Sequence, residues 1–223
     1  GACNAVSILT NEEAARGVVT HSSGNHAQAL ALAAKMRGVP AYIVMPETAS
    51  PVKQAAVEGY GAEVILCRPT LEARETTADE VQQRTGATFI HPYDHPHIIA
   101  GQGTATLELV EQVRELGSEL DAIIAPVGGG GLLSGTCIAA SGLASPPRVF
   151  AAEPLGADDA ARSFAAGELI PQTGPNTIAD GLLTSLGELT WPVIRDHVEQ
   201  IVTVSDEQIV AAMRLLWERA KLL

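Results

Sequence analysis

The chain has 223 residues, of which 46% are hydrophobic and 18% charged, and its formal net charge is −12. A chain of this length and composition buries a substantial core, as one large α/β domain or as two small ones. The acidic balance excludes nucleic acid and anionic membrane surfaces as partners, because both need clustered Lys and Arg. No apolar run approaches the roughly 18 to 20 residues that a membrane span requires, and no segment resembles a signal peptide. A small molecule is the expected ligand.

Short apolar and β-prone runs alternate along the chain with segments of helical periodicity. The predicted strands are residues 17–20, 41–45, 63–67, 88–90, 122–126, 149–153 and 200–204. The predicted helices are residues 27–36, 52–60, 76–85, 98–116, 133–140 and 206–223. Strands that alternate with helices indicate parallel sheets, so we expect an α/β protein with two lobes of parallel sheet flanked by helices.

Residues at the helix ends support two of these helices. Gly38 follows the first one, and Ser205 with Gln208 forms a capping-box pattern before the last. The chain begins with Gly1 rather than Met and stops on Leu223 without a helix-ending signal. We therefore expect an internal piece of a longer protein.

The strand count suggests how the chain is divided. Residues 17–94 contain enough strands and helices for a small domain, and residues 95–223 with residues 1–16 are expected to form an incomplete large domain. Since no Pro- or Ser-rich linker separates them, we expect two closely packed lobes with a ligand cleft between them.

The three cysteines, Cys3, Cys67 and Cys137, are widely spaced and lie among small or apolar residues. This pattern favours buried, reduced thiols over disulfides or a metal cluster, and it predicts a cytoplasmic protein.

Four consecutive glycines, Gly128 to Gly131, stand in the stretch "APVGGGGLLSG" between a predicted strand and a predicted helix. A strand that leads through such a run into a helix gathers free backbone N–H groups at the positive end of the helix dipole, which is a site for a phosphate. The pattern lacks the ending of a P-loop and the spacing of a dinucleotide fingerprint. A tightly packed turn is the alternative explanation.

A second polar loop follows the first predicted strand, where Ser22, Ser23, Asn25 and His26 surround Gly24. Their side chains and N–H groups are suited to bind a carboxylate at the start of a helix. Simple helix capping by Ser or Asn is the alternative.

Seven motifs, in order along the whole chain, resemble the serine racemase and serine/threonine dehydratase family of fold-type II pyridoxal phosphate enzymes. They are "VVTHSSGNHAQALALAAK", "YIVMPETASPVKQAAVEGYGAEV", "HPYDHPHIIAGQGT", "APVGGGGLLSG", "VFAAEPLGADD", "TIADGL" and "WERAKLL". The resemblance implies a fold like that of tryptophan synthase β and pyridoxal 5'-phosphate as the cofactor. It also implies a small hydroxy-amino-acid substrate and a homodimer.

The resemblance assigns roles to individual positions. The implied cofactor-binding residues are Asn25, which meets the ring hydroxyl, the phosphate-binding Gly128, Gly129, Gly130, Gly131 and Leu132, and Gly181. The implied substrate-binding residues are Ser22, Gly24, His26, Arg74 and Asp180. An ion pair with Glu72 or Glu75 is the alternative for Arg74, and a turn residue before Gly181 is the alternative for Asp180.

The chain differs from the family in that it does not contain the family's Schiff-base lysine. This lysine lies in a Lys-x-Arg-Gly-Ala motif whose last two residues match Gly1 and Ala2, so it would stand three positions before this chain begins. Lys35, Lys53 and Lys221 are expected to be surface charges. The family's C-terminal glycine-rich segment is also missing, and we expect the chain as given to be a catalytically incomplete part of an enzyme.

Racemisation requires acid/base groups on both faces of the substrate's α-carbon, whereas loss of the β-hydroxyl leads to dehydration. The lysine would serve one face, and Ser23 matches the serine that serves the other; many threonine dehydratases carry Ala there. A role of Ser23 as a hydrogen-bonding loop residue is the alternative.

Glu153, Asp159 and the carbonyl group of Ala157 resemble the divalent cation site of the racemases, and hard oxygen ligands suit Mg²⁺ or Ca²⁺. Capping of the following helix by Asp158 and Asp159 is the alternative.

Further matches bear on regulation and substrate choice. Gln28, Tyr60 and Lys221 match residues that hold ATP as an effector in animal racemases. Tyr93 replaces a racemase Asn and points toward the dehydratases. The three histidines of this segment, His91, His95 and His97, are expected to be ordinary loop residues.

Three hypotheses remain open. The first is a serine racemase with serine/threonine dehydratase activity. The second is a threonine or 3-hydroxyaspartate dehydratase without significant racemase activity, and the third is a noncatalytic ligand-binding module.

Overall fold

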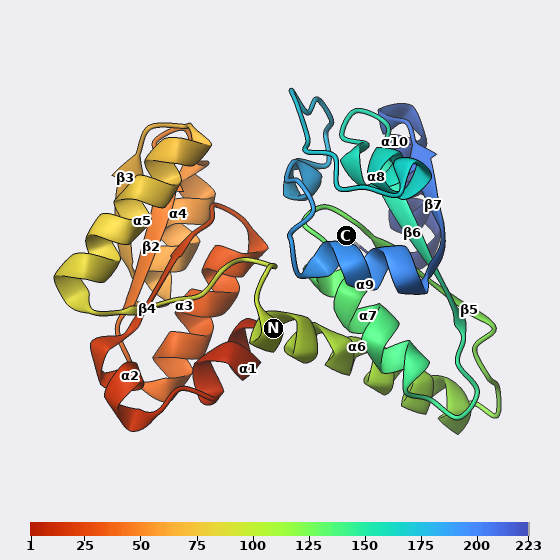
Figure 1. The fold of residues 1–223 in the computed structure, drawn as a ribbon, viewed down its shortest axis with the longest axis horizontal. Coiled ribbons are helices and arrows are strands. Elements are labelled where there is room, and N and C mark those ends of the chain that lie inside the picture. The colour runs from red at the N-terminus through yellow and green to blue at the C-terminus, as the bar shows by residue number, and fades with distance from the viewer. Residues whose placement is uncertain (223) are drawn as a thin grey trace. The chain divides into compact units, whose positions relative to one another are not determined.

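A computed structural model of the chain describes residues 1–222, and it divides into two compact units, Gly1–Gly101 and Gln102–Leu223 (Figure 1). Each unit contains one parallel sheet. The prediction of two parallel sheets flanked by helices is confirmed. The finer division into residues 1–16, 17–94 and 95–223 stays a prediction.

The sheet of the first unit has the order β3-β2-β1-β4. Its strands are β1 (Val18–His21), β2 (Ala41–Pro46), β3 (Glu63–Cys67) and β4 (Thr88–Phe89). All neighbours run parallel, with Val18 opposite Ala41 and Val19 opposite Phe89. Parallel strands bring their carboxyl ends to one edge of the sheet, so the segments that follow β1 and β4 emerge together.

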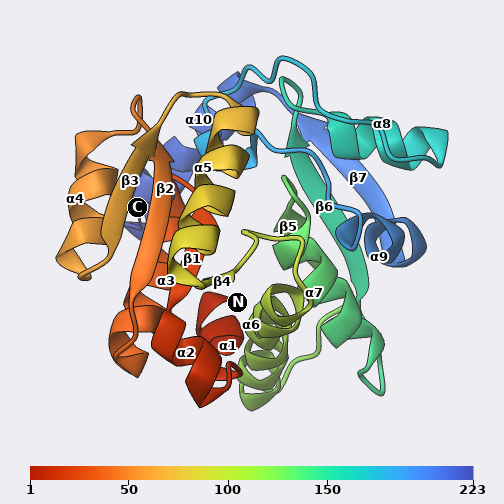
Figure 2. The ribbon, with the colours of Figure 1, turned by 60° about the vertical axis from the view of Figure 1, so that its left-hand side comes forward.

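Alternate residues of these strands serve two separate cores, because successive side chains point to opposite faces. Val18 and Ile43 pack with the apolar residues of α3 (Asn25–Arg37), whereas Val19 and Val44 pack with those of α5 (Leu71–Thr85). Figure 2 shows α5 and α4 (Pro51–Gly59) on opposite sides of β2 and β3. The helices α1 (Ala2–Ser7) and α2 (Asn11–Arg16) complete this part.

The second unit is built on a three-stranded parallel sheet of order β5-β6-β7. Its strands are β5 (Ala122–Pro126), β6 (Arg148–Pro154) and β7 (Val198–Val204). The helices α7 (Gly131–Ser141) and α9 (Thr190–His197) contact each other and cover one face, with Leu133, Ala151 and Ile194 fully buried between them. The other helices are α8 (Asp159–Ala166), α10 (Asp206–Leu215) and α6 (Pro96–Glu115), whose first turns belong to the first unit.

All seven predicted strands are present, but several helices were missed. These are α1, α2, α8, α9 and a 3₁₀ turn at Asp180–Leu182. Each has eight residues or fewer, which is too short for a clear helical periodicity. The last predicted helix is shorter than expected, because α10 ends at Leu215 and a π-helical turn, Leu216–Ala220, follows. Leu223, the predicted end, lies outside the described residues.

The predicted caps are confirmed, since Gly38 ends α3 with a left-handed φ of 73° and Ser205 and Gln208 form a reciprocal capping box. The prediction of three buried cysteines is wrong for Cys3, which is exposed, whereas Cys67 and Cys137 are buried and all three are free. The short helix α1 turns Ala2, Ala5 and Val6 toward the core, so Cys3 faces outward. Among residues 1–222, no helix is long and apolar enough to cross a membrane.

Candidate functional site

The glycine run connects the end of β5 to the start of α7, and its backbone offers hydrogen-bond donors. In the described part of the chain, none of the main-chain N–H groups from Gly128 to Leu132 donates a hydrogen bond. The four glycines are buried, and α7 starts without a side-chain cap. Since unpaired buried N–H groups are rare and a helix dipole is positive at this end, the loop is suited to hold an anion.

The protein's own packing constrains two of the four glycines, Gly130 strongly and Gly128 less so. A Cβ atom on Gly128 would lie 3.1 Å from the Cα atom of Leu182. Gly130 has a φ of +89°, and a Cβ atom there would lie 2.8 Å from both Oγ1 of Thr190 and Cδ1 of Ile194. The glycine run therefore combines the two explanations that the sequence left open, a tightly packed turn and an anion-binding loop.

The second polar loop connects β1 to α3, and its main-chain donors are also unpaired. Gly24 is the N-cap of α3, no side chain caps this helix, and the N–H groups of Asn25, His26 and Ala27 make no hydrogen bond within residues 1–222. Capping by Ser or Asn, the alternative from the sequence, is therefore wrong. A Cβ atom on Gly24 would meet no atom within 4 Å, so the space in front of this helix end is open.

The two serines of this loop differ in their contacts. Oγ of Ser22 accepts a hydrogen bond from the N–H group of Gly24 at 3.4 Å. The half-buried Ser23 makes no hydrogen bond in the part of the chain that the structure describes. The hydroxyl group of Ser23 is thus not used to hold the loop together.

The side chain of His26 is used to hold the loop, which leaves its main-chain N–H group for a ligand. Its Nε2 atom lies 3.3 Å from the carbonyl oxygen of Ile90, and burial lowers the pKa of His26 to about 4. The imidazole is therefore neutral at pH 7, and the proton on Nε2 is donated to Ile90. Nδ1 is then an acceptor, so the group that His26 offers to an anion is its main-chain N–H.

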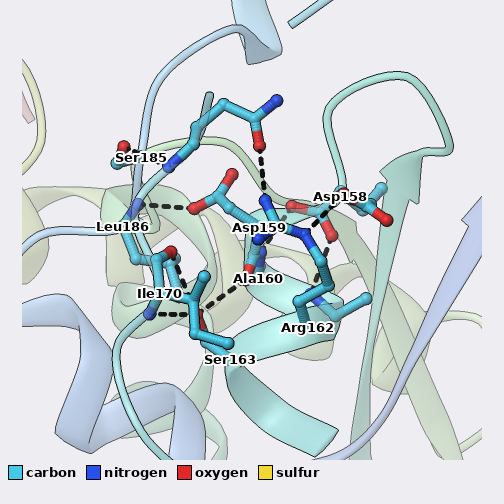
Figure 3. Close-up of polar contacts among 11 residues, drawn as sticks. Asp158, Asp159, Ala160, Arg162, Ser163, Ile170, Ser185 and Leu186 are labelled. Carbon is cyan, nitrogen blue, oxygen red and sulfur yellow. Dashed lines mark hydrogen bonds and ion pairs between the residues drawn. The ribbon is translucent and has the colours of Figure 1, made fainter. Parts of the chain in front are cut away.

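Two buried carboxylates lie at the start of α8. Glu153 is 1% exposed, and its two oxygens accept hydrogen bonds from the N–H groups of Ala160 and Ala161 at 2.9 and 2.8 Å. Asp159 is fully buried and accepts a hydrogen bond from the N–H group of Leu186 at 3.0 Å (Figure 3). Burial raises the pKa of Glu153 to about 7 and raises the pKa of Asp159.

One oxygen of this pair has no partner. Oδ1 of Asp159 is buried and makes no hydrogen bond among the described residues, which is costly for a carboxylate unless a cation faces it or a proton neutralises it. Asp158 is the N-cap of α8, but its side chain accepts a hydrogen bond from Arg162 at 2.8 Å and does not cap the helix (Figure 3). The capping alternative is therefore wrong for Asp158. No group of three or more His, Cys, Asp or Glu side chains in residues 1–222 is arranged to hold a metal ion, so a cation here would need main-chain oxygens as well.

The comparison with known protein families decides the chain's membership. A family model described as pyridoxal-phosphate dependent enzyme matches residues 1–223. The chain belongs to this pyridoxal-phosphate dependent enzyme family. The resemblance drawn from the sequence motifs is confirmed, and so is the prediction of a fold-type II enzyme.

Individual members of the family are close in sequence and structure. The chain is 54% identical to serine racemase of Dictyostelium discoideum, over 100% of this chain and 68% of that protein. It is 51% identical to β-hydroxyaspartate dehydratase of Paracoccus denitrificans (strain Pd 1222), over 100% and 69%. The structure of maize serine racemase matches with a TM-score of 0.95 and 49% identity, over 99% of this chain and 66% of that chain. The chain thus spans about two thirds of the length of these relatives.

Other predicted residues of this pyridoxal-phosphate dependent enzyme are placed as follows. The half-buried Arg74 forms no ion pair with Glu72 or Glu75 within residues 1–222, and its Nε atom is buried without a hydrogen-bond partner. The surface ion pair proposed as its alternative is wrong. Asp180 and Gly181 are exposed in the 3₁₀ turn that packs beside Gly128.

The histidines near β4 make hydrogen bonds within their own segment, and the lysines differ in exposure. Nδ1 of His91 accepts hydrogen bonds from the N–H groups of Tyr93 and Asp94, and Nδ1 of His95 accepts one from His97. The prediction of loop histidines is confirmed for His91 and His95 and wrong for His97, which lies in the first turn of α6. Lys35 and Lys221 are exposed and Lys53 is half-buried. Of the predicted effector residues, Gln28 is half-buried on α3, and Tyr60 packs on the first unit's core with Lys35 above its ring.

Sequence reasoning missed Thr190. Its Oγ1 atom donates a hydrogen bond to the carbonyl group of Gly129 at 2.8 Å. A buried threonine that begins a short helix carries no pattern that would have identified it.

Proposed function

We propose that the intact protein is a pyridoxal phosphate-dependent serine racemase that also dehydrates serine and threonine. The observation that carries this proposal is the state of Ser23, whose hydroxyl group is unpaired within residues 1–222 beside the open end of α3. A hydroxyl group in this state is available to a substrate. The similarity to the Dictyostelium and maize serine racemases supports the same activity.

The glycine loop of the second unit fits the phosphate group of the cofactor. The four glycines are buried, and the N–H groups from Gly128 to Leu132 are unpaired in the described residues at the positive end of α7. A phosphate would satisfy all of these donors. The cofactor, when bound, withdraws electrons from the substrate's α-carbon and so makes its proton removable.

The start of α3 in the first unit fits the substrate's carboxylate. The N–H groups of Asn25, His26 and Ala27 supply donors, and the hydrogen bond from His26 to Ile90 fixes the loop. Gly24 leaves the approach open. The exposed side chain of Asn25 is proposed to meet the cofactor's ring hydroxyl group, and Arg74, Asp180 and Gly181 are kept as further ligand-binding residues.

Ser23 is proposed to carry a proton to and from one face of the α-carbon. A single base tends to return the proton to the face that it left, so inversion requires a second group on the opposite face. A residue outside the described chain, the family's lysine, would serve that face. Serine is a weak base, so the N–H groups of its own loop are expected to assist the transfer.

A dehydratase acting on 3-hydroxyaspartate is the second candidate. It is favoured by the 51% identity to the Paracoccus enzyme and by Tyr93, whose ring packs edge-on against His91 with centroids 4.6 Å apart. The third hypothesis, a noncatalytic ligand-binding module, is not favoured, because the family to which the chain belongs is described as an enzyme family.

Glu153, Asp159 and the carbonyl group of Ala157 are proposed to bind Mg²⁺ or Ca²⁺. The unpaired Oδ1 atom of Asp159 supports this, and carboxylate and carbonyl oxygens are the ligands these ions prefer. The proposal also includes ATP as an effector that binds at Gln28, Tyr60 and Lys221. It further includes a homodimer and a cytoplasmic location.

Product analysis of the protein expressed from its complete gene tests the function. With pyridoxal phosphate present, L-serine is expected to give D-serine together with pyruvate and ammonia. Oxaloacetate from 3-hydroxyaspartate without D-serine from L-serine would favour the second candidate instead. Absence of cofactor binding would overturn both. Light scattering with and without ATP tests the dimer and the effector.

A further inference from the structure

Thr190, the first residue of α9, is completely buried against the glycine loop. Its Oγ1 atom lies 2.8 Å from the carbonyl oxygen of Gly129, and it accepts a hydrogen bond from the N–H group of Gly187 at 2.9 Å. The carbonyl oxygen of Gly187 is farther away, at 3.2 Å. Because a hydroxyl group has one proton and accepts freely, Thr190 can donate to Gly129 and accept from Gly187 at the same time.

The carbonyl group of Gly129 is held by the hydroxyl group of Thr190 at 2.8 Å and, at a longer 3.4 Å, by the N–H group of Gly187, and its direction determines where the next N–H group points. The peptide unit is planar and trans, so the carbonyl group of Gly129 and the N–H group of Gly130 point in opposite directions. Holding that carbonyl group toward Thr190 therefore directs the N–H group of Gly130 away from α9. This N–H group is one of the unpaired donors of the loop.

Packing at Gly130 reinforces this orientation. Gly130 has a φ of +89°, and the space that its Cβ atom would fill is occupied by the side chains of Thr190 and Ile194. The side chain of Thr190 thus acts at two neighbouring residues of the loop, through the hydrogen bond of Oγ1 to Gly129 and through the packing of Oγ1 and Cβ against Gly130. A rotation of the Gly129–Gly130 peptide unit would break the hydrogen bond to the carbonyl group of Gly129.

Thr190 is itself held from two sides. Its carbonyl oxygen accepts a hydrogen bond from Oγ of Ser134 on α7 at 3.3 Å. Gly187, its hydrogen-bond donor, follows Leu186, whose N–H group donates to the carboxylate of Asp159 at 3.0 Å. The loop's geometry is therefore tied through Thr190 to α7 and to the buried carboxylate of α8.

We propose that Thr190 is a positioning residue for the cofactor's phosphate, and that its hydroxyl group orients the Gly129–Gly130 peptide unit so that Gly130 donates to the phosphate. The proposal rests on the proposed function, since it assumes that the glycine loop receives pyridoxal phosphate. It assigns to Thr190 no contact with the cofactor. A lost hydroxyl group should therefore weaken cofactor binding while leaving the other donors of the loop in place.

The test compares substitutions at one buried position in the full-length protein. Thr190→Val keeps the shape of the side chain and removes the hydrogen bond, whereas Thr190→Ser keeps the hydrogen bond and removes the methyl group. Thr136→Val is the control, because Thr136 is a buried threonine of α7 whose hydroxyl group makes no hydrogen bond to the glycine loop within residues 1–222. The measurements are the dissociation constant of pyridoxal phosphate from titration of the apo-protein and the ³¹P chemical shift of the bound phosphate.

Thr190→Val is expected to weaken binding about tenfold, the effect of one lost hydrogen bond, and to move the ³¹P signal. Thr190→Ser is expected to stay within about threefold of the unchanged protein. Equal binding and an unmoved ³¹P signal in Thr190→Val would overturn the proposal, as would the same loss in Thr136→Val. If Thr190→Val does not fold, Thr190→Cys, with its weaker donor, gives the same comparison.

The proposed function and this inference fail in different ways. If the unchanged full-length protein does not bind pyridoxal phosphate, the function is wrong. If it binds the cofactor and Thr190→Val binds it equally well, the function stands and the role of Thr190 falls.

Discussion

The Nε2 atom of His26, near the start of α3, lies 3.3 Å from the carbonyl oxygen of Ile90, just after β4. This contact joins two segments that are 64 residues apart in the chain. Burial lowers the pKa of His26 to about 4, against a smaller opposing effect of this hydrogen bond, so the imidazole is neutral at pH 7. The loop that we propose for the substrate's carboxylate is thus fixed by a side chain whose protonation is disfavoured by burial.

The first prediction is that the first unit loses stability in mild acid. The unfolded chain binds a proton at His26 near pH 6.5, whereas the folded chain does so only near pH 4. Because the unfolded state binds more protons in this window, the free energy of unfolding falls as the pH drops from about 6.5 to 4, by up to about 1.4 kcal/mol per pH unit for this group. Urea unfolding at a series of pH values measures it.

His26→Asn removes the titrating group and keeps a side-chain N–H donor. Its free energy of unfolding should change less steeply over the same window. His91 also has a pKa lowered by burial to about 4, so some dependence on pH remains. An unchanged slope in His26→Asn would show that His26 does not carry this sensitivity.

The second prediction separates glycines required by packing from a glycine required by a ligand. Gly130→Ala forces a side chain into a left-handed backbone and against Thr190 and Ile194, and is expected to destabilise the second unit by about 3 kcal/mol. Gly181→Ala is the control, because its Cβ atom meets nothing within 4 Å. Thermal or urea unfolding checks the difference, and similar stabilities of the two variants would contradict it.

Gly24→Ala should behave in the opposite way. Its added Cβ atom meets no protein atom within 4 Å, so stability should change by less than about 0.5 kcal/mol. The methyl group would stand where the substrate's carboxylate is proposed to bind, and KM should rise. Kinetics of the full-length enzyme measure this effect, and an unchanged KM would place the substrate elsewhere.

The sequence was sufficient for the sheets and for the two loops that follow β1 and β5. Alternation of apolar runs with helical periodicity depends on local spacing, and glycines and small polar residues mark strand ends directly. The sequence predicted an anion-binding loop at Gly128 and Gly130 but not the residues that pack against them. Those residues, Leu182, Thr190 and Ile194, lie 50 or more positions further along the chain. Such contacts exist only after folding.

The same limit explains the missed residues. Thr190 begins the eight-residue helix α9 and acts through a neighbour that is 61 positions away. The capping alternatives for the α3 loop and for Asp158 were also undecidable from spacing, because a cap and a free helix start share the same residue types. Only the contacts show that α3 starts uncapped and that Asp158 pairs with Arg162.

The third prediction concerns divalent cations. If Mg²⁺ or Ca²⁺ binds at Glu153 and Asp159, it stabilises the folded protein, by about 2.7 kcal/mol at a concentration of 100 times the dissociation constant. Asp159→Asn removes the carboxylate that contains the unpaired Oδ1 atom. The rise in Tm on adding the cation should therefore be lost in this variant. Asp158→Asn is the matched control, since its carboxylate pairs with Arg162. Equal loss in both variants would contradict the assignment.

The fourth prediction tests Ser23 by the ratio of two reactions. Ser23→Ala removes a hydroxyl group that makes no hydrogen bond in the described chain, so folding and cofactor binding should be unchanged. Proton transfer on the serine face should be lost, and the rate of D-serine formation from L-serine should fall by about 100-fold or more. Dehydration of L-serine needs a proton removed from one face only, so pyruvate should still form at a comparable rate.

Chiral chromatography of serine and an assay for pyruvate, run on the same samples, give both rates. Ser22→Ala is the matched control, because Ser22 holds the loop through the N–H group of Gly24 and its loss should slow both reactions together. A parallel fall of both products in Ser23→Ala would mean that this hydroxyl group binds the substrate rather than moving its proton. The ratio decides, because a general loss of binding lowers both rates, whereas a missing proton carrier lowers only the one that needs both faces.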